Sequence, residues 1–231
     1  MKKLNFVAAC IAMFLVQWMS AQQKAAPPID RPAEPNLLFD DDGGKVQFVP
    51  ADLSASAGKT FHGGAVMKSL QQISIFLGRG WADDAVRSRQ NTLADVGNSS
   101  RTNPHFAEAK AHNLKVLRAA PQAEDFTDLS TKPLNDLDIQ RKLNDMLQSK
   151  AIPAPDASTV YVVFLGPKAS SSLGGNQAGV DYAAYHNVVN LDAGEVRYVV
   201  VPFQQDAQRQ AEAAVRALVE TGLNPNGQGW F

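Results

Sequence analysis

The sequence predicts a single three-layer α/β domain, in which a mixed central sheet is flanked by helices. Two observations support this class: apolar runs typical of buried strands, and amphipathic stretches with helical spacing that alternate with those runs. The domain is expected over residues 59–231, after a signal peptide at 1–21 and an extended tether at 22–58. About 170 residues are enough to enclose a substantial hydrophobic core.

The first elements of the domain are a strand, a helix and a second strand. The run QQISIFLG at 71–78 is β-branched and aromatic and closes on glycine, which predicts a strand. Residues 81–97 place apolar side chains on roughly one helical face, with Asp83 or Asp84 as the N-terminal cap. The segment NLKVLRA at 113–119 predicts another strand.

The second half of the domain carries the strongest periodic signals. NDLDIQRKLNDMLQSK at 135–150 is the clearest amphipathic helix, with apolar residues at i, i+4, i+7 and i+8 behind Asn135 or Asp136 as the N-terminal cap. The nearly unbroken apolar runs at 160–165 and 196–202 predict strands buried on both faces. Residues 205–222 return to a helix, which Gly222 is expected to terminate. We expect the two apolar strands at the centre of one sheet, with the helix at 136–149 packed across a face.

The N-terminus has the layout of a secretory signal peptide. Two lysines precede an apolar run from Phe6 to Val16, which is followed by the small pair Ser20-Ala21. The run is shorter than the ~20 residues that a membrane span needs. We therefore expect cleavage after Ala21 and export to the periplasm or the extracellular space, with no stable membrane span in the mature chain.

The single cysteine offers a competing interpretation of this N-terminus. VAAC at 7–10 resembles the motif that precedes a lipidated cysteine, but it falls in the middle of the apolar run, which favours the plain signal peptide. Cleavage after Ala21 removes Cys10, the only cysteine. The mature chain then has neither disulfides nor thiol chemistry.

The charge distribution of the chain argues against a nucleic-acid partner. Removing Lys2 and Lys3 takes the formal net charge from −1 to −3, and no long run of either sign follows, so nothing indicates a nucleic-acid surface.

The tether is rich in Pro, Ala, Asp and Gly, with at most a short strand at 45–50. Its triplet Asp40–Asp42 lacks the spaced ligands of a calcium loop and is interpreted as a solvated turn.

Known catalytic signatures are incomplete. The HGG motif at 62–64 is typical of an oxyanion hole, but no G-x-S-x-G nucleophile elbow accompanies it. The Gly- and Ser-rich stretch at 169–179 lacks the Lys-Ser or Lys-Thr of a phosphate-binding loop and is interpreted as a mobile loop. His105, Glu108 and His112 share one helical face, a pattern that a surface helix also satisfies, so no metal site is predicted there.

Four segments of the chain carry a family resemblance: FHGGAVMKSLQQISIFLGRGW, IPAPDASTVYVVFLGP, YAAYHNVV followed by GEVRYVVVPF, and LVETGLNPNGQGWF. Together they resemble the bacterial relatives of the plant phosphate-induced (EXORDIUM-like) secreted proteins. The resemblance covers about residue 60 to the end. It implies an exported α/β protein without an established enzymatic activity, whose plant relatives are associated with the cell wall and growth.

Some bacterial members of this family look like metallopeptidases near the C-terminal helix. Compared with their motif, the later glutamate corresponds to Glu220 and the Asp-Pro pair to Asn224-Pro225, but the His-Glu pair falls on Arg216 and Ala217. A protonated guanidinium is not an ordinary zinc ligand, and alanine cannot act as a general base. This copy of the site is expected to be inactive, with no catalytic residue, metal or cofactor.

The resemblance also gives His62 a partner, because His186 lies where the family carries its other recurrent histidine. The two imidazoles, with Tyr182 and Tyr185 and with Glu220 nearby, are the candidate ligand-binding residues of one polar cleft. The structural alternative, which we favour, is that each histidine hydrogen-bonds to a loop carbonyl, while Gly63 and Gly64 turn the backbone with positive φ.

Two functions remain open from the sequence. The first is a non-catalytic domain of uncharacterised role that binds a ligand or partner in the cell envelope or outside the cell. The alternative is a zinc-dependent, peptidase-like hydrolase centred on His62 and His186, with a carboxylate from Asp181, Glu195 or Glu220. The positions of these side chains distinguish the two functions, because only the hydrolase requires the histidines and a carboxylate to lie close together.

Overall fold

The computed structural model describes residues 46–53, 61–98, 103–120, 122–129 and 131–229. All of them lie in the second of two compact units of the chain, Pro35–Phe231. The predicted signal peptide, Cys10 and the acidic triplet lie outside the described residues.

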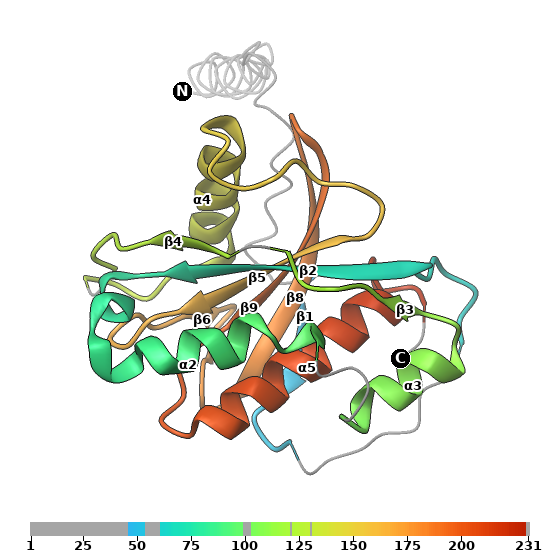
Figure 1. Cartoon of the computed structure of the whole chain (residues 1–231), viewed down its shortest axis with the longest axis horizontal. Helices are drawn as coiled ribbons and strands as arrows, with labels where there is room; N and C mark the ends of the chain where they lie inside the picture. The colour runs from blue at the N-terminus through green and yellow to red at the C-terminus, as the bar shows by residue number, and fades with distance from the viewer. Residues whose placement is uncertain (1–45, 54–60, 99–102, 121, 130, 230–231) are drawn as a thin grey trace, which may run out of the picture. The chain divides into compact units, whose positions relative to one another are not determined.

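One mixed sheet forms the middle layer of this unit (Figure 1). Its order is β1-β8-β9-β5-β2, with β3 and β4 both pairing with β2. The strands from β9 to β4 are parallel to one another, whereas β8 is antiparallel to β9 and to β1. The strands of the sheet are β1 Gln47–Pro50, β2 Ser69–Leu77, β3 Lys115–Val116, β4 Ala123–Asp125, β5 Thr159–Leu165, β8 Tyr182–Leu191 and β9 Gly194–Val201.

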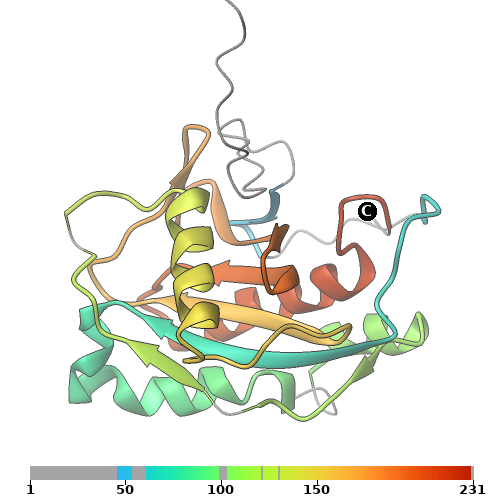
Figure 2. The same cartoon turned by 90° about the horizontal axis from the view of Figure 1, so that it is seen from above.

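Helices cover both faces of the sheet. α2, α3 and α5 pack on one face, and α4 lies across the other, as Figures 1 and 2 show. The predicted three-layer α/β class is therefore confirmed. The helices are η1 Arg79–Ala82, a single 3-10 turn, and α2 Asp84–Ala94, α3 His105–Ala111, α4 Asp136–Gln148 and α5 Ala207–Leu223.

β5 is the most buried strand, and its alternating side chains supply both cores. All seven of its residues are buried. Val160, Val162 and Phe164 join the core under α2, α3 and α5, whereas the residues between them face α4. β9 pairs with β5 in parallel register, so the predicted central pair of strands is confirmed.

The helix starts follow the predicted capping chemistry. The Asp83 side chain caps α2 by accepting a hydrogen bond of 2.9 Å from the Ala85 N–H. Asn135 and Asp138 form a reciprocal capping box at the start of α4. The prediction for Gly222 is wrong, because α5 continues to Leu223. A Cβ at this glycine would clash with the Leu114 side chain, so the residue permits close packing.

Three segments differ from the sequence-based picture. β8 was not predicted as a strand, and the strand expected at 113–119 is reduced to β3, two residues long. The serine-rich loop contains a small hairpin, β6 Ser172–Leu173 with β7 Asn176–Gln177. The short strand allowed within the predicted tether exists as β1, which pairs with β8 at the edge of the sheet.

Candidate functional site

The two predicted histidines occupy different environments. His62 is exposed, and its backbone N–H donates to the Gly229 carbonyl at 2.9 Å. His186 is only 1 % exposed. It lies opposite Val199 of β9, a residue of the core under α5, so His186 belongs to that face of the sheet. Because His62 is at the surface and His186 is enclosed in the core, the two imidazoles do not line one open cleft.

The two predicted tyrosines lie on the other face of the sheet. Tyr185 pairs with Val200, and both belong to the core that α4 covers. A register shift between Val49 and Pro50 of β1 marks a bulge that returns Tyr182 to the same face, with its ring centroid 5.9 Å from that of Tyr185. Tyr185 and His186 are adjacent in a strand and therefore point to opposite layers.

The degenerate peptidase motif lies in α5 and has packing roles. Arg216 bonds to Glu212 across one helical turn at 3.2 Å, Ala217 is fully buried, and Glu220 is half-buried. Asn224 connects three parts of the chain: its Nδ2 donates to Gln47 Oε1 of β1 at 2.6 Å, and its Oδ1 accepts from the Gly229 N–H. Through these two hydrogen bonds, Asn224 fixes the turn that follows α5 against β1.

The glycines beside His62 act differently from each other. Gly63 has φ +86°, the left-handed conformation that was expected of it. Gly64 does not, and a Cβ there would instead clash with the Gln228 backbone. The glycine pair therefore shapes the entry to β2 against the C-terminal turn.

The carboxylates considered for a hydrolase are engaged elsewhere. Glu195 pairs with Arg197, and Asp181 accepts the Gln177 N–H at 2.8 Å. His105 Nε2 lies 3.5 Å from Glu212 Oε1. Over the residues that the structure describes, no group of three or more His, Cys, Asp or Glu side chains could hold a metal ion.

The structure instead reveals a polar pocket of about 400 Å³ at the carboxyl ends of β2, β4 and β5. Three loops, one following each strand, supply its walls. No sequence motif marked it, although both the Gly-Arg-Gly after β2 and the Gly-Pro-Lys after β5 follow predicted strands. The lining residues are Gly78, Arg79, Gly80, Asp83, Asp128, Leu129, Pro167, Lys168 and Ala169.

This position is where the chain connections diverge. After β2 the chain continues to β3 and β4, at one edge of the sheet. After β5 it continues to β8 and β9, which lie toward the opposite edge. In open α/β sheets, ligands bind outside the carboxyl ends of the strands at such a switch point. We refer to the cavity as the switch-point pocket.

Backbone hydrogen bonds fix the three loops to one another. The Gly78 N–H donates to the Asp125 carbonyl at 2.8 Å, and the Arg79 N–H donates to the Thr127 carbonyl at 3.0 Å. The Gly166 N–H donates to the Leu77 carbonyl at 2.8 Å. Because the loops are joined in this way, the pocket walls are preorganised.

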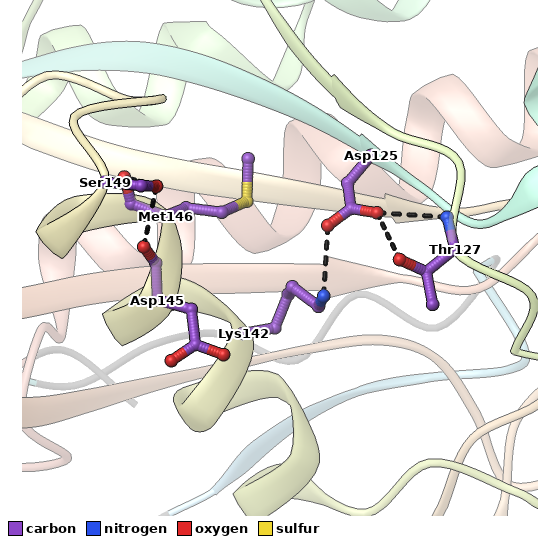
Figure 3. Close-up of polar contacts among 6 residues, drawn as sticks. All are labelled: Asp125, Thr127, Lys142, Asp145, Met146 and Ser149. Atoms are coloured by element: carbon purple, nitrogen blue, oxygen red, sulfur yellow. Dashed lines mark hydrogen bonds and ion pairs between the residues drawn. The ribbon is translucent and has the colours of Figure 1, made fainter.

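A half-buried ion pair attaches the end of β4 to α4 (Figure 3). Asp125 lies 3.0 Å from Lys142 Nζ and accepts hydrogen bonds from both the Thr127 N–H and hydroxyl. Burial raises the pKa of Asp125, but the hydrogen bonds from Thr127 and Lys142 outweigh it, so the pKa falls below its usual value. The carboxylate therefore stays ionised and holds the pocket wall.

A second polar cluster, in the core under α4, is structural. Asp136 Oδ2 accepts hydrogen bonds from Gln140 and Asn187, both at 2.8 Å, and from the Tyr198 hydroxyl at 2.7 Å. Burial and the charge of Asp136 raise the pKa of Tyr185 and Tyr198 well above 10.0. The cluster anchors the first turn of α4 to β8 and β9.

No family model, curated protein or solved structure matches this chain. None of the helices in the described part of the chain is long and apolar enough to cross a membrane.

Proposed function

We propose that this chain is an exported, non-catalytic domain that binds a small polar ligand from the cell envelope or its surroundings. The observation that carries the proposal is the switch-point pocket, a polar cavity of about 400 Å³ placed where parallel α/β sheets bind ligands. The EXORDIUM-like resemblance, which implies an exported protein without established enzymatic activity, agrees with this function.

Binding fits the pocket better than catalysis does. Its described lining contains no histidine, serine or cysteine, the residue types that most often supply a general base or nucleophile. Of its two carboxylates, Asp83 already caps α2. Preorganised loops favour affinity, because little conformational entropy is lost when a ligand binds.

The test is a ligand screen read by amide chemical shifts. Neutral sugars, acidic sugars, amino acids and dipeptides are titrated into the full chain labelled with ¹⁵N. We expect saturable shifts of the Gly78, Gly80 and Gly166 amides, which report on the pocket without any substitution. Shifts confined to other parts of the chain, or no binding by any compound, would contradict the proposal.

A pocket-filling variant makes the screen specific. Ala169→Trp places an indole in the pocket and is expected to weaken binding by about tenfold or more. Ala157→Trp is the matched control, because Ala157 is exposed and precedes β5 at the opposite end of the strand. Thermal melting of both variants establishes that the fold is retained.

A further inference from the structure

We infer that the ligand of the switch-point pocket carries a carboxylate group, held between the Arg79 guanidinium and the Lys168 ammonium. The inference rests on the proposed function and adds the chemical class of the ligand. It follows from which charges in the pocket already have partners within the protein and which do not.

The two cations of the pocket are not paired with any carboxylate of the described residues. Within the described residues, neither Arg79 nor Lys168 forms an ion pair or a side-chain hydrogen bond, whereas Lys142 and Arg216 are paired with carboxylates. The two cations come from different loops, those after β2 and β5. An anionic group that enters between them would neutralise both.

The carboxylates of the pocket are already engaged. Asp83 Oδ1 accepts the Ala85 N–H at the start of α2, and Asp128 also has an interaction of its own. The two carboxylates are therefore partly neutralised or hydrogen-bonded already, whereas the two cations are not. A ligand anion would gain more from the two cations than a ligand cation would gain from the two carboxylates. The asymmetry predicts an acidic ligand, although the four formal charges cancel.

Because the pocket has no net formal charge, the number of charges on the acid also matters. A dianionic phosphate would gain two attractions but would also meet the charges of Asp83 and Asp128. A carboxylate carries a single charge, and its planar pair of oxygens matches the fork of a guanidinium. A singly charged carboxylate is therefore the better complement.

Lys168 lies in a tight turn directly after β5. Its φ is +75°, a left-handed conformation that is unfavourable for residues other than glycine. Lys150 has φ +58°, but it follows the end of α4, where such a conformation is a common helix termination. Lys168 likewise has a local reason for its conformation: it is the third residue of the β-turn 166–169, which the Ala169 N–H closes by donating to the Gly166 carbonyl at 3.1 Å. Turns with proline in second place, here Pro167, commonly have a positive φ at the third residue.

The experiment compares matched acids with neutral molecules of the same shape. The probes are glucuronate against glucose, N-acetylalanine against N-acetylalanine amide, and inorganic phosphate alone, each titrated into the full chain and followed at the Gly78, Gly80 and Gly166 amides. We expect at least one of the two acids to bind about tenfold more tightly than its neutral partner and than phosphate.

Three variants assign the charges. Arg79→Gln and Lys168→Gln are each expected to weaken binding of the acid by about tenfold and to leave the affinity for its neutral partner unchanged. Lys150→Gln is the matched control, since it also removes an exposed cation from a left-handed residue, and it should bind like the wild type.

The inference and the proposed function fail in different ways. If a neutral probe binds the pocket as tightly as its acid, or if phosphate binds more tightly, the carboxylate assignment is overturned while ligand binding stands. If neither acid binds but another compound of the screen does, the outcome is the same. If nothing binds the pocket, both are overturned.

Discussion

All four tyrosines of the chain have completely buried side chains: Tyr161, Tyr182, Tyr185 and Tyr198. Burial is the main reason that the pKa of each rises, for Tyr182 to about 12. Nearby carboxylates add to the effect, above all Asp136 for Tyr185 and Tyr198. At the residue scale, the protein therefore keeps its phenols neutral well beyond the pH at which a free tyrosine ionises.

The first prediction concerns alkaline stability. Tyrosines of the unfolded chain ionise near pH 10.0, whereas those of the folded chain do so later. Their contribution to the free energy of unfolding is thus fully present below pH 10.0 and is lost as the pH rises above it. Urea unfolding should show falling stability from about pH 10 to about pH 12, and tyrosinate absorbance should appear only with unfolding. A tyrosine that titrates normally in the folded protein would contradict this.

A second prediction at this scale concerns the half-buried carboxylate of Asp136. Asp136→Ala removes the acceptor of three hydrogen bonds and leaves their donors buried, so it should lower the free energy of unfolding by about 2–4 kcal/mol in urea titrations. Asp145→Ala, an exposed position of the same helix, should change it by less than about 0.5 kcal/mol. Equal effects of the two substitutions would show that the cluster is not stabilising.

At the scale of elements, β5 joins the two cores and the pocket. Phe164 is fully buried, stacks on Phe76 with ring centroids 5.3 Å apart, and accepts the Trp81 indole N–H at its carbonyl. The strand ends one residue later, at Leu165, where the loop bearing Lys168 begins. Packing in the middle of this strand therefore fixes the position of one pocket wall.

The third prediction is that Phe164→Ala lowers the free energy of unfolding by ~3–5 kcal/mol, through lost burial and the cavity left behind. Phe126→Ala is the control, because Phe126 is 37 % exposed and should cost far less. Denaturant unfolding of both variants measures the difference. A Phe164→Ala protein that melts at the wild-type temperature would show that this strand is not a core element.

For the whole molecule, a fourth prediction is that the protein recovered from its native host begins near Gln22 and contains no cysteine. The Lys-Lys start, the apolar run and Ser20-Ala21 motivate it. N-terminal sequencing with mass spectrometry measures the outcome. A retained Met1, or a lipid on Cys10, would overturn it.

The fifth prediction is that the purified protein neither holds stoichiometric zinc nor cleaves peptides. A catalytic zinc needs about three protein ligands, and Arg216 and Ala217 occupy the positions where a zinc-dependent relative would supply a ligand and a base. Elemental analysis and a peptide-cleavage assay test both parts. One zinc per chain, lost in both His62→Ala and His186→Ala, would revive the hydrolase.

The sequence by itself determined the α/β class, the amphipathic helices α2 and α4, and the two central strands, because burial and periodicity are local properties. It missed β8, whose Tyr-Ala-Ala-Tyr-His start does not alternate clearly in polarity, and so it grouped Tyr185 with His186 although a strand sends neighbouring side chains to opposite faces. Only the tertiary structure decided the strand order. That order brings together the loops after β2, β4 and β5, segments distant in the sequence, and so creates the pocket between Arg79 and Lys168. No local pattern specifies which strand ends become neighbours, since their pairing depends on how the two cores pack as a whole.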